Sequence, residues 1–529
     1  MSARRNASIV TAAIVLACAG PVRPPDVVVF ASGSDLESAN PLVTIHPLSR
    51  QVQRHVLFVT LARYDEALRP RPYFARQWQW SADRRSLDLV LLRGLPWDDG
   101  VSTTAEDVVF TLDRARDPRT GYARAADLAG LAAVVATSDT SVRVTFTSAQ
   151  RDLPPIFCEL PIVPRHVLDS VAPADMRRSA FGTRPVSNGP FRFVDRVPGQ
   201  RWTFARNARF PAALGGPPRM RELVIAVVDE PTTKFAGLAS GDLDFAGIAP
   251  TMAALANRDP LIRVVDYPIL FSTALIFNAH RPPFDDVRVR RAFDSSLDRE
   301  RIVSAALAGY GKPAAGPVPT ENPIALPLAP RHDARVADSL LDDAGWRRGR
   351  DGWRRRERPL AVTLLTVGSG DNAIEQLVQA DLAERGVRVE IRQMELAAFL
   401  AVARAPTKQF DVLITGVSGD LALAYLGAMY DSRQRGSALD YADFHSPVLD
   451  ALFDRARSAT SESQLRAAWN GVQQWLHEQA PAAWIYHSRG LQGVNARMRD
   501  VSMDLRGELA TVAQWTTSAD LPRSARGSR

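Results

Sequence analysis

Short apolar segments rich in β-branched residues alternate with amphipathic helical segments along almost the whole chain. Strands are predicted first, at residues 27–31, 86–92, 141–146, 191–194, 202–205 and 223–228. After about residue 230 helices and strands alternate, with helices at 334–344, 373–385 and 461–479 and a strand at 360–367 among them. This order is typical of mixed α/β lobes. The chain has 529 residues, which is too long for one hydrophobic core, so two or three lobes are expected.

The first 25 residues are predicted to lie outside the folded part. Arg4 and Arg5 precede a short apolar run at residues 9–17, a pattern typical of a secretory signal peptide. A membrane span needs roughly 20 apolar residues, about twice the length of this run. Residues 15–18 resemble a bacterial lipobox, which implies cleavage before Cys18 and acylation of that residue. We therefore expect a signal peptide at 1–17, a proline-rich tether at 18–25 and a stable lipid anchor.

The net charge of +7 does not indicate nucleic-acid binding, because the basic residues are dispersed. Cys158 has no partner once Cys18 is acylated, so we expect no disulfide. Its apolar neighbours predict that Cys158 is a small buried residue.

Strong catalytic patterns are missing from the sequence. The eight histidines are scattered singly, with neither zinc-ligand spacing nor a His-Glu-x-x-His pattern. No Gly-x-Ser-x-Gly motif is present, and the paired aspartates fit turns and helix ends better than acid–base catalysis. We expect no catalytic residue, no metal site, no cofactor and no enzymatic activity.

Seven blocks, in order, resemble the extracytoplasmic solute-binding proteins of family 5, which serve dipeptide, oligopeptide and nickel ABC importers. The most recognisable is Pro96-Trp97-Asp98-Asp99-Gly100, followed by a helix that begins near Thr104. The other blocks are residues 62–80, 187–199, 238–248, 283–303, 337–346 and 480–487.

The resemblance implies an α/β, periplasmic-binding-protein type II fold with two lobes joined by a hinge. The first lobe would comprise residues 26–47, 184–268 and 490–517, with residues 48–183 as an extra domain on it. The second lobe would comprise residues 269–489, and residues 518–529 would be a disordered tail. The hinge would lie near Tyr267 and Arg489.

The resemblance also places a ligand-binding aspartate at Asp420. In peptide-binding members an aspartate in this context meets the free ammonium group of the peptide, and Gly419 and Tyr425 flank it here. A buried carboxylate needs a cationic partner, although Asp420 as an ordinary loop residue remains the alternative. The tryptophan usual in this motif is replaced by Val417, and no arginine opens the helix at residues 373–385 to hold a ligand carboxylate. Longer peptides and other amine-bearing solutes therefore stay open.

Further candidate ligand contacts follow other predicted strands. Gly33, Ser34 and Asp35 form a turn after the first strand, and ligands of open α/β folds gather at such ends. Asn278 follows the strand at residues 275–277. Trp484 is a candidate cleft aromatic, with a place in the core as its alternative. For each of the others the alternative is ordinary loop capping.

The expected function is that of a substrate-binding lipoprotein of an ABC importer. It would be exported, anchored in the periplasm or cell envelope, monomeric, and partnered by a permease and an ATPase. The alternatives are a receptor for a nickel chelate, opine, haem or sugar, and a ligand sensor without transport.

Overall fold

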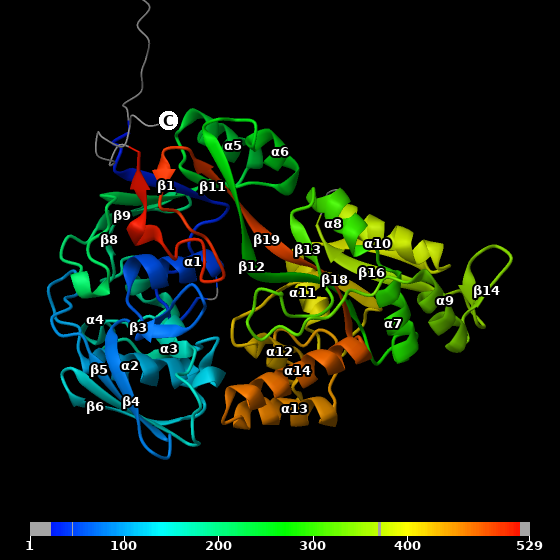
Figure 1. Ribbon diagram of the computed structural model, residues 1–529, viewed down its shortest axis with the longest axis horizontal. Coiled ribbons are helices and arrows are strands. Elements are labelled where there is room, and N and C mark those ends of the chain that lie inside the picture. Colours follow the sequence, from blue (N-terminus) through cyan, green and yellow to red (C-terminus); the bar gives the residue numbers. More distant parts are fainter. Residues whose placement is uncertain (1–22, 45, 369–371, 519–529) are drawn as a thin grey trace, which may run out of the picture.

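The computed structural model describes residues 23–44, 46–368 and 372–518. The predicted signal peptide, most of the tether, Cys18 and residues 519–529 lie outside the described residues. The chain forms two bodies side by side, joined by two long strands, β12 (Ile262–Phe277) and β19 (Ala482–Asn495) (Figure 1).

One sheet runs through both bodies, in the order β17-β16-β18-β12-β19-β11-β1-β10-β9-β8. The first lobe contributes β1 (Val27–Ser32), β8 (Phe191–Val197), β9 (Arg201–Arg206), β10 (Glu222–Val227) and β11 (Phe245–Gly247), with helices α5 (Pro231–Ser240) and α6 (Ala253–Ala256). The second lobe contributes β16 (Ala361–Val367), β17 (Arg388–Met394) and β18 (Val412–Ser418), and β13 (Gly311–Pro313) pairs with β19.

Helices cover the sheet of the second lobe, whose buried side chains form two hydrophobic clusters. The helices are α7 (Val287–Ser296), α8 (Arg299–Leu307), α9 (Ala334–Asp343), α10 (Ala373–Glu384), α11 (Leu396–Ala403), α12 (Ala424–Tyr430), α13 (Pro447–Ser458) and α14 (Glu462–Gln479). Asp286 begins α7 by accepting the Arg288 N–H at 2.9 Å, as its place before an apolar helical pattern predicts.

An additional domain packs against the first lobe. Its strands β4 (Ala75–Trp80), β5 (Ser86–Leu91), β6 (Leu131–Ser138) and β7 (Ser141–Phe146) form a sheet in the order β4-β5-β7-β6. The remaining elements are α1 (Pro47–Val52), continued by a π-helical turn (Gln53–Leu57), β2 (Ala62–Tyr64), β3 (Pro70–Pro72), α2 (Ala105–Arg116), α3 (Ile156–Glu159) and α4 (Arg165–Leu168). One continuous hydrophobic cluster joins this domain to the first lobe, and it includes Cys158, whose predicted burial is confirmed.

Two of the motif blocks have clear structural roles in this domain. Thr104 and Asp107 form a capping box at the start of α2, where the helix is expected to begin. A Cβ on Gly189 would lie 2.5 Å from the Leu57 carbonyl carbon, so only glycine permits the two backbones to approach here.

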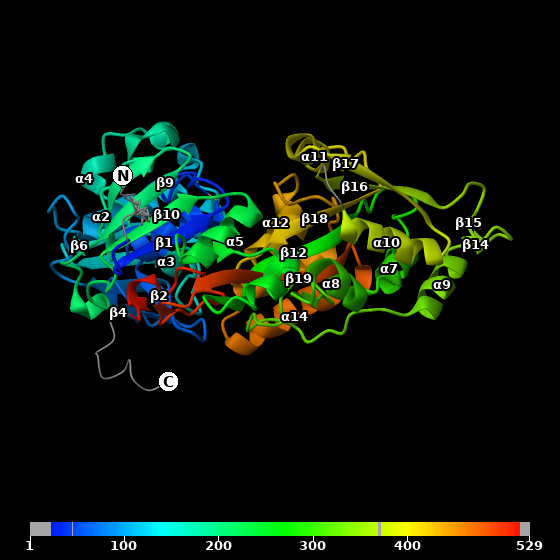
Figure 2. The same cartoon turned by 90° about the horizontal axis from the view of Figure 1, so that it is seen from above.

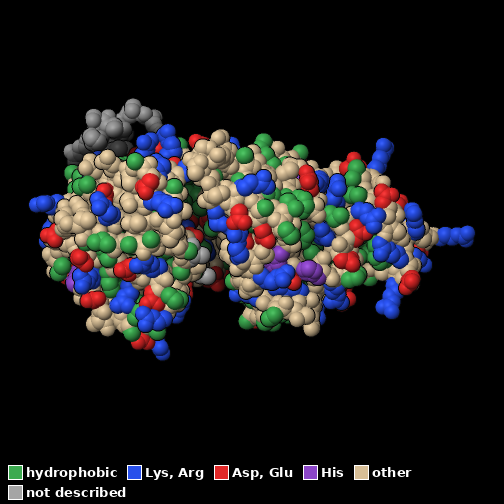
Figure 3. Space-filling model, turned by 90° about the horizontal axis from the view of Figure 1, so that it is seen from below, with side chains coloured by type: hydrophobic (Ala, Val, Ile, Leu, Met, Phe, Trp, Pro, Cys, Tyr) green, Lys and Arg blue, Asp and Glu red, His purple; other side chains and the backbone are tan. Residues whose placement is uncertain are grey.

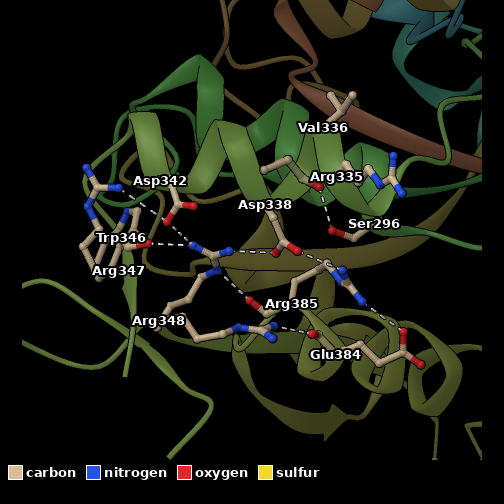
Figure 4. Close-up of polar contacts among 12 residues, drawn as sticks. Ser296, Arg335, Val336, Asp338, Asp342, Trp346, Arg347, Arg348, Glu384 and Arg385 are labelled. Atoms are coloured by element: carbon tan, nitrogen blue, oxygen red, sulfur yellow. Dashed lines mark hydrogen bonds and ion pairs between the residues drawn. The ribbon is translucent and has the colours of Figure 1, made fainter. Parts of the chain in front are cut away.

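The second lobe ends in a basic hairpin, β14 (Arg347–Arg348) and β15 (Arg354–Arg355), at the end of the molecule away from the first lobe (Figure 2). Arg354 is buried and holds the hairpin to α9 through Asp338 (2.7 Å) and Asp342 (2.8 Å). Figure 4 shows both carboxylates of α9, with Arg385 at the end of α10 also directed at Asp338 (3.0 Å).

Candidate functional site

An indentation between the two bodies, the cleft, is visible in the space-filling view (Figure 3). Strands β12 and β19 pass beneath it. Their pairing is regular up to Pro268–Arg489, shifts register, and resumes at Ser272–His487. A bulge of this kind disrupts the ladder and bends the strand locally, and it lies next to Tyr267 and Arg489, where the hinge is expected.

Charged side chains surround this crossing. Arg489 forms ion pairs with Asp266 and with Glu321, the latter at 3.3 Å. The Tyr267 hydroxyl donates to Glu508 at 2.9 Å. The crossing is thus tied to both lobes by side chains of opposite charge.

Asp420 lies directly after β18 in the second lobe, close enough to Arg124 and Glu159 of the additional domain for their charges to act on it. Its carboxylate accepts the backbone N–H groups of Ala422 (2.9 Å), Ala424 (3.0 Å) and Tyr425 (3.0 Å), and so caps the start of α12. Among the described residues no arginine, lysine or histidine forms an ion pair with it. Burial raises the pKa of the Asp420 carboxyl, and these backbone hydrogen bonds oppose that effect only in part.

Gly419 and Tyr425 lie with Asp420, as the sequence predicts from their proximity in the chain. The Gly419 N–H donates to the Leu270 carbonyl at 2.8 Å, which joins the loop after β18 to the crossing strand. Tyr425 is buried, and its hydroxyl donates to the Pro317 carbonyl at 2.8 Å. Its ring packs beside Gly419, where an added Cβ would lie 3.3 Å from it.

A cluster of arginines and carboxylates on the additional domain lies close enough to Asp420 for its charges to change the pKa of that carboxyl. Arg124 forms ion pairs with Glu159 and, at 2.6 Å, with Asp127, and Arg50 reaches Glu159 at 3.4 Å. The Arg124 charge lowers the pKa of Asp420 and the Glu159 charge raises it. The Glu159 side chain is only 5% exposed, so this is a buried ion cluster on the wall of the cleft.

Glu159 is ionised in spite of its burial. Burial alone raises its pKa, but the charges of Arg124, Arg54 and Arg50 outweigh that effect and lower it. Sequence reasoning missed this cluster. Its members are distant in the chain and match no spacing motif, so only the packing of α1 and α3 against the loop that carries Arg124 reveals it.

The two walls of the cleft also touch directly. The Arg151 guanidinium of the additional domain donates to the Ser461 carbonyl, which precedes α14, at 3.4 Å. The two bodies therefore touch at this point as well as being joined by β12 and β19.

The turn at Gly33, Ser34 and Asp35 belongs to the first lobe and does not contact Asp420. Gly33 and Ser34 are exposed, and the Ser34 hydroxyl contacts the His46 ring at 3.1 Å. Asp35 accepts from the Trp202 indole (2.6 Å), Arg196 (2.8 Å) and the Gly199 N–H (3.0 Å). Burial raises the pKa of the Asp35 carboxyl, but these hydrogen bonds outweigh burial and lower the pKa overall. In this structure Asp35 therefore holds β8 and β9.

Asn278 and Trp484 are not brought to Asp420. Asn278 is buried and donates to the carbonyls of Lys408 (3.1 Å) and Phe410 (2.9 Å), before β18 begins. The seven residues of β18 separate it from Asp420 by roughly 20 Å. Trp484 is 5% exposed within the same hydrophobic cluster as Tyr425, which is the core position given above as its alternative.

Comparison with known proteins identifies what this architecture resembles. The model for bacterial extracellular solute-binding proteins, family 5 Middle, matches residues 69–437. The oligopeptide-binding protein AppA of Bacillus subtilis is 24% identical over 479 residues, covering 87% of this chain and 86% of AppA. The structure of AppA with a nonapeptide superposes with a TM-score of 0.78 at 22% identity, over 93% of this chain and 99% of AppA.

Relatives with other ligands share the fold. NikA from Brucella suis, in complex with Fe(III)-EDTA, superposes with a TM-score of 0.83 at 19% identity, over 93% of this chain and 100% of NikA. Heme-binding protein A of Haemophilus influenzae is 26% identical over 459 residues, covering 81% of each chain. These similarities confirm the expected two-lobe type II fold. Within the described residues no helix has the length and apolar character required to cross a membrane.

Proposed function

Since the chain belongs to the bacterial extracellular solute-binding proteins of family 5, we propose that it captures short peptides or related amine-bearing solutes in its cleft. It delivers them to the permease of an ABC importer in the membrane. A ligand that contacts both walls favours the closed form by the difference between its affinities for the closed and open forms.

The observation that carries this proposal is the Asp420 carboxylate. It lies near the charges of the additional domain, burial raises its pKa, and no basic side chain of the described residues forms an ion pair with it. An ammonium group of the ligand supplies the missing positive charge, and the facing Arg124–Glu159 cluster supplies polar contacts for the rest of the ligand.

The first experiment identifies the ligand. Native mass spectrometry of the protein purified from its host is expected to release a mixture of short peptides. One uniform non-peptide mass, such as a metal chelate or a haem, would reject the peptide class and leave the family assignment intact.

The second experiment tests Asp420 with a co-purified peptide and its N-acetylated form. By calorimetry, Asp420→Asn is expected to weaken binding of the free peptide by about 2–4 kcal/mol, which is roughly 30- to 700-fold. Acetylation should weaken binding to the unsubstituted protein by a similar factor and have little further effect on the variant. Equal affinities of the protein and Asp420→Asn for the free peptide would remove Asp420 from the site.

A matched control separates binding from helix capping. Asp420→Asn leaves one of three backbone donors unpaired, which costs about 1–3 kcal/mol of stability. Asp107 caps α2 in the additional domain and, like Asp420, accepts backbone N–H groups on both oxygens, from Arg165 on Oδ1 (2.8 Å) and from Thr104 on Oδ2 (2.8 Å). Asp107→Asn should lose comparable stability and bind peptide normally.

The anchor rests on the sequence alone. We infer that Cys18 is acylated and that the protein is held at a membrane of the cell envelope after export. Radiolabelled palmitate is expected to enter the protein, and Cys18→Ser should abolish the label and release the protein into the soluble fraction. Label retained in the variant would contradict the lipobox assignment.

A further inference from the structure

A histidine and two aspartates converge in the second lobe, at the opposite end of β18 from Asp420. The residues are Asp440, Asp443 and His445, on the loop between α12 and α13, and their ligand atoms lie within 4.8 Å of one another. His445 Nε2 is 3.3 Å from Asp440 Oδ2 and 3.5 Å from Asp443 Oδ1. A tetrahedral ion with bonds of about 2.0–2.1 Å separates its ligands by about 3.4 Å, which matches both distances from His445 Nε2.

The hydrogen bonds of His445 determine which ring nitrogen faces the carboxylates. Nδ1 lies 3.2 Å from the Tyr430 carbonyl, which can only accept, so Nδ1 carries the proton. The lone pair of Nε2 in the neutral ring then points at two carboxylates. Three electron-rich groups in that arrangement need a positive charge between them, either a second proton on Nε2 or a bound metal ion. A carbonyl that fixes the ring in this way is the usual support of a metal-bound histidine.

Asp440 supplies an independent indication of a missing partner. It is 2% exposed, and its Oδ2 accepts the Gly436 N–H at 2.8 Å. Its Oδ1 has no hydrogen-bond partner among the described residues. A buried carboxylate oxygen without a partner is costly, and a cation bound by both oxygens of Asp440 would remove that cost.

A fourth ligand stands close to the other three. His280, beyond the end of β12, is exposed, and its Nε2 is 3.6 Å from Asp443 Oδ2 and 2.6 Å from the Asp443 carbonyl. A turn of this side chain would direct its imidazole at the same ion. Arg435 contacts Asp443 Oδ1 at 3.2 Å and, being 60% exposed, is free to move away.

We propose that Asp440, Asp443 and His445, with His280 or a water as the fourth ligand, bind a divalent transition-metal ion such as Zn²⁺. Imidazole with carboxylate is a donor set that suits zinc, cobalt, nickel and manganese. The ion would join the 435–446 loop to the end of β12. The site stands apart from the cleft and is independent of the transported solute.

The test measures zinc binding to the full-length mature protein after treatment with EDTA and gel filtration. Calorimetry with ZnCl₂ is expected to show one equivalent bound with a dissociation constant below about 1 µM, and zinc should raise the melting temperature. His445→Gln and Asp443→Asn should each weaken binding by about 100-fold or more and abolish the thermal shift. Asp443 lies at the rim of the cluster, so its variant tests the site even if His445→Gln fails to fold.

Two matched controls distinguish this site from others. His166 pairs with the single carboxylate of Asp99 at 2.7 Å in the additional domain, and His166→Gln should leave zinc binding unchanged. Asp420→Asn should also leave it unchanged, which separates this proposal from the proposed peptide site. Substoichiometric zinc binding, or binding unaffected by His445→Gln and Asp443→Asn, would overturn the proposal. It would mean that a proton on His445 Nε2, and not a metal ion, balances the charge of the two carboxylates.

Discussion

Removing the charge of Glu159 tests whether the cleft wall is built on a buried ion cluster. Glu159→Gln keeps the size of the side chain but leaves Arg124 with Asp127 alone and removes the carboxylate from Arg50. Since the Glu159 side chain is 5% exposed and that of Arg124 is 18% exposed, solvent screens this change weakly. Breaking a buried pair in this way costs about 3–5 kcal/mol, because the remaining charge stays desolvated.

The assay is urea unfolding at 25 °C, followed by tryptophan fluorescence and circular dichroism. With a slope of about 3 kcal/mol per molar urea, the midpoint of the first-lobe transition should fall by about 1–2 M. Glu106→Gln is the matched control, because its ion pair with Arg165 is about half exposed on both sides. That variant should lose at most about 1 kcal/mol.

A double-mutant cycle assigns the loss to the pair itself. If Glu159 and Arg124 are coupled, Glu159→Gln combined with Arg124→Gln should cost clearly less than the sum of the two single changes. If the free energy of unfolding of Glu159→Gln lies within about 1 kcal/mol of that of the unsubstituted protein, as expected for the exposed control, the cluster is solvated. The conclusion that Glu159 belongs to a buried ion cluster would then be wrong.

Three further changes probe the hinge, the acid sensitivity and the hairpin. A Cβ on Gly490 would lie 2.2 Å from the Tyr267 ring, so Gly490→Ala should cost about 1–3 kcal/mol in urea unfolding, and adding Tyr267→Leu should restore much of it. Burial lowers the pKa of His487 to about 4 in the folded protein. Between pH 6.5 and 4 this imidazole is therefore protonated in the unfolded chain but not in the folded one, and the free energy of unfolding falls by about 3 kcal/mol over that range. His487→Asn should flatten that part of the pH–stability curve, and an unchanged slope would exclude His487 as its source. Arg354→Lys cannot bridge Asp338 and Asp342 as the guanidinium does, so it should cost about 2–4 kcal/mol and speed amide exchange in the hairpin, and unaltered exchange there would contradict the role of Arg354.

Local patterns predicted most of the elements of the second lobe. The helix predicted at residues 461–479 is α14, with Ser461 as its cap, and the helix predicted at 334–344 is α9. The strand predicted at 360–367 is β16. These agree because caps, apolar periodicity and β-branched runs act over a few residues and are written in consecutive positions.

The strand predicted at residues 275–277 is far longer in the structure, where β12 covers Ile262–Phe277. Its first half contains Arg263, Asp266 and Pro268, which argue against a strand locally. Pairing with β19 and β18 overrides that preference. The hinge depends on this long strand, so its geometry emerges only from the assembled sheet.

The sequence by itself determined the family, the α/β class, most of the regular elements and the place of Asp420 after a strand. Tertiary structure decided what surrounds that carboxylate. Folding set the Arg124–Glu159 cluster opposite it, held Asp35 and Asn278 elsewhere, and gathered Asp440, Asp443 and His445 at the far end of the same strand. Motifs and periodicity record interactions between near neighbours in the chain. The Arg124–Glu159 cluster forms between residues that only packing brings together. Asp440, Asp443 and His445 are close in the chain, but the fold of their loop decides that their ligand atoms meet.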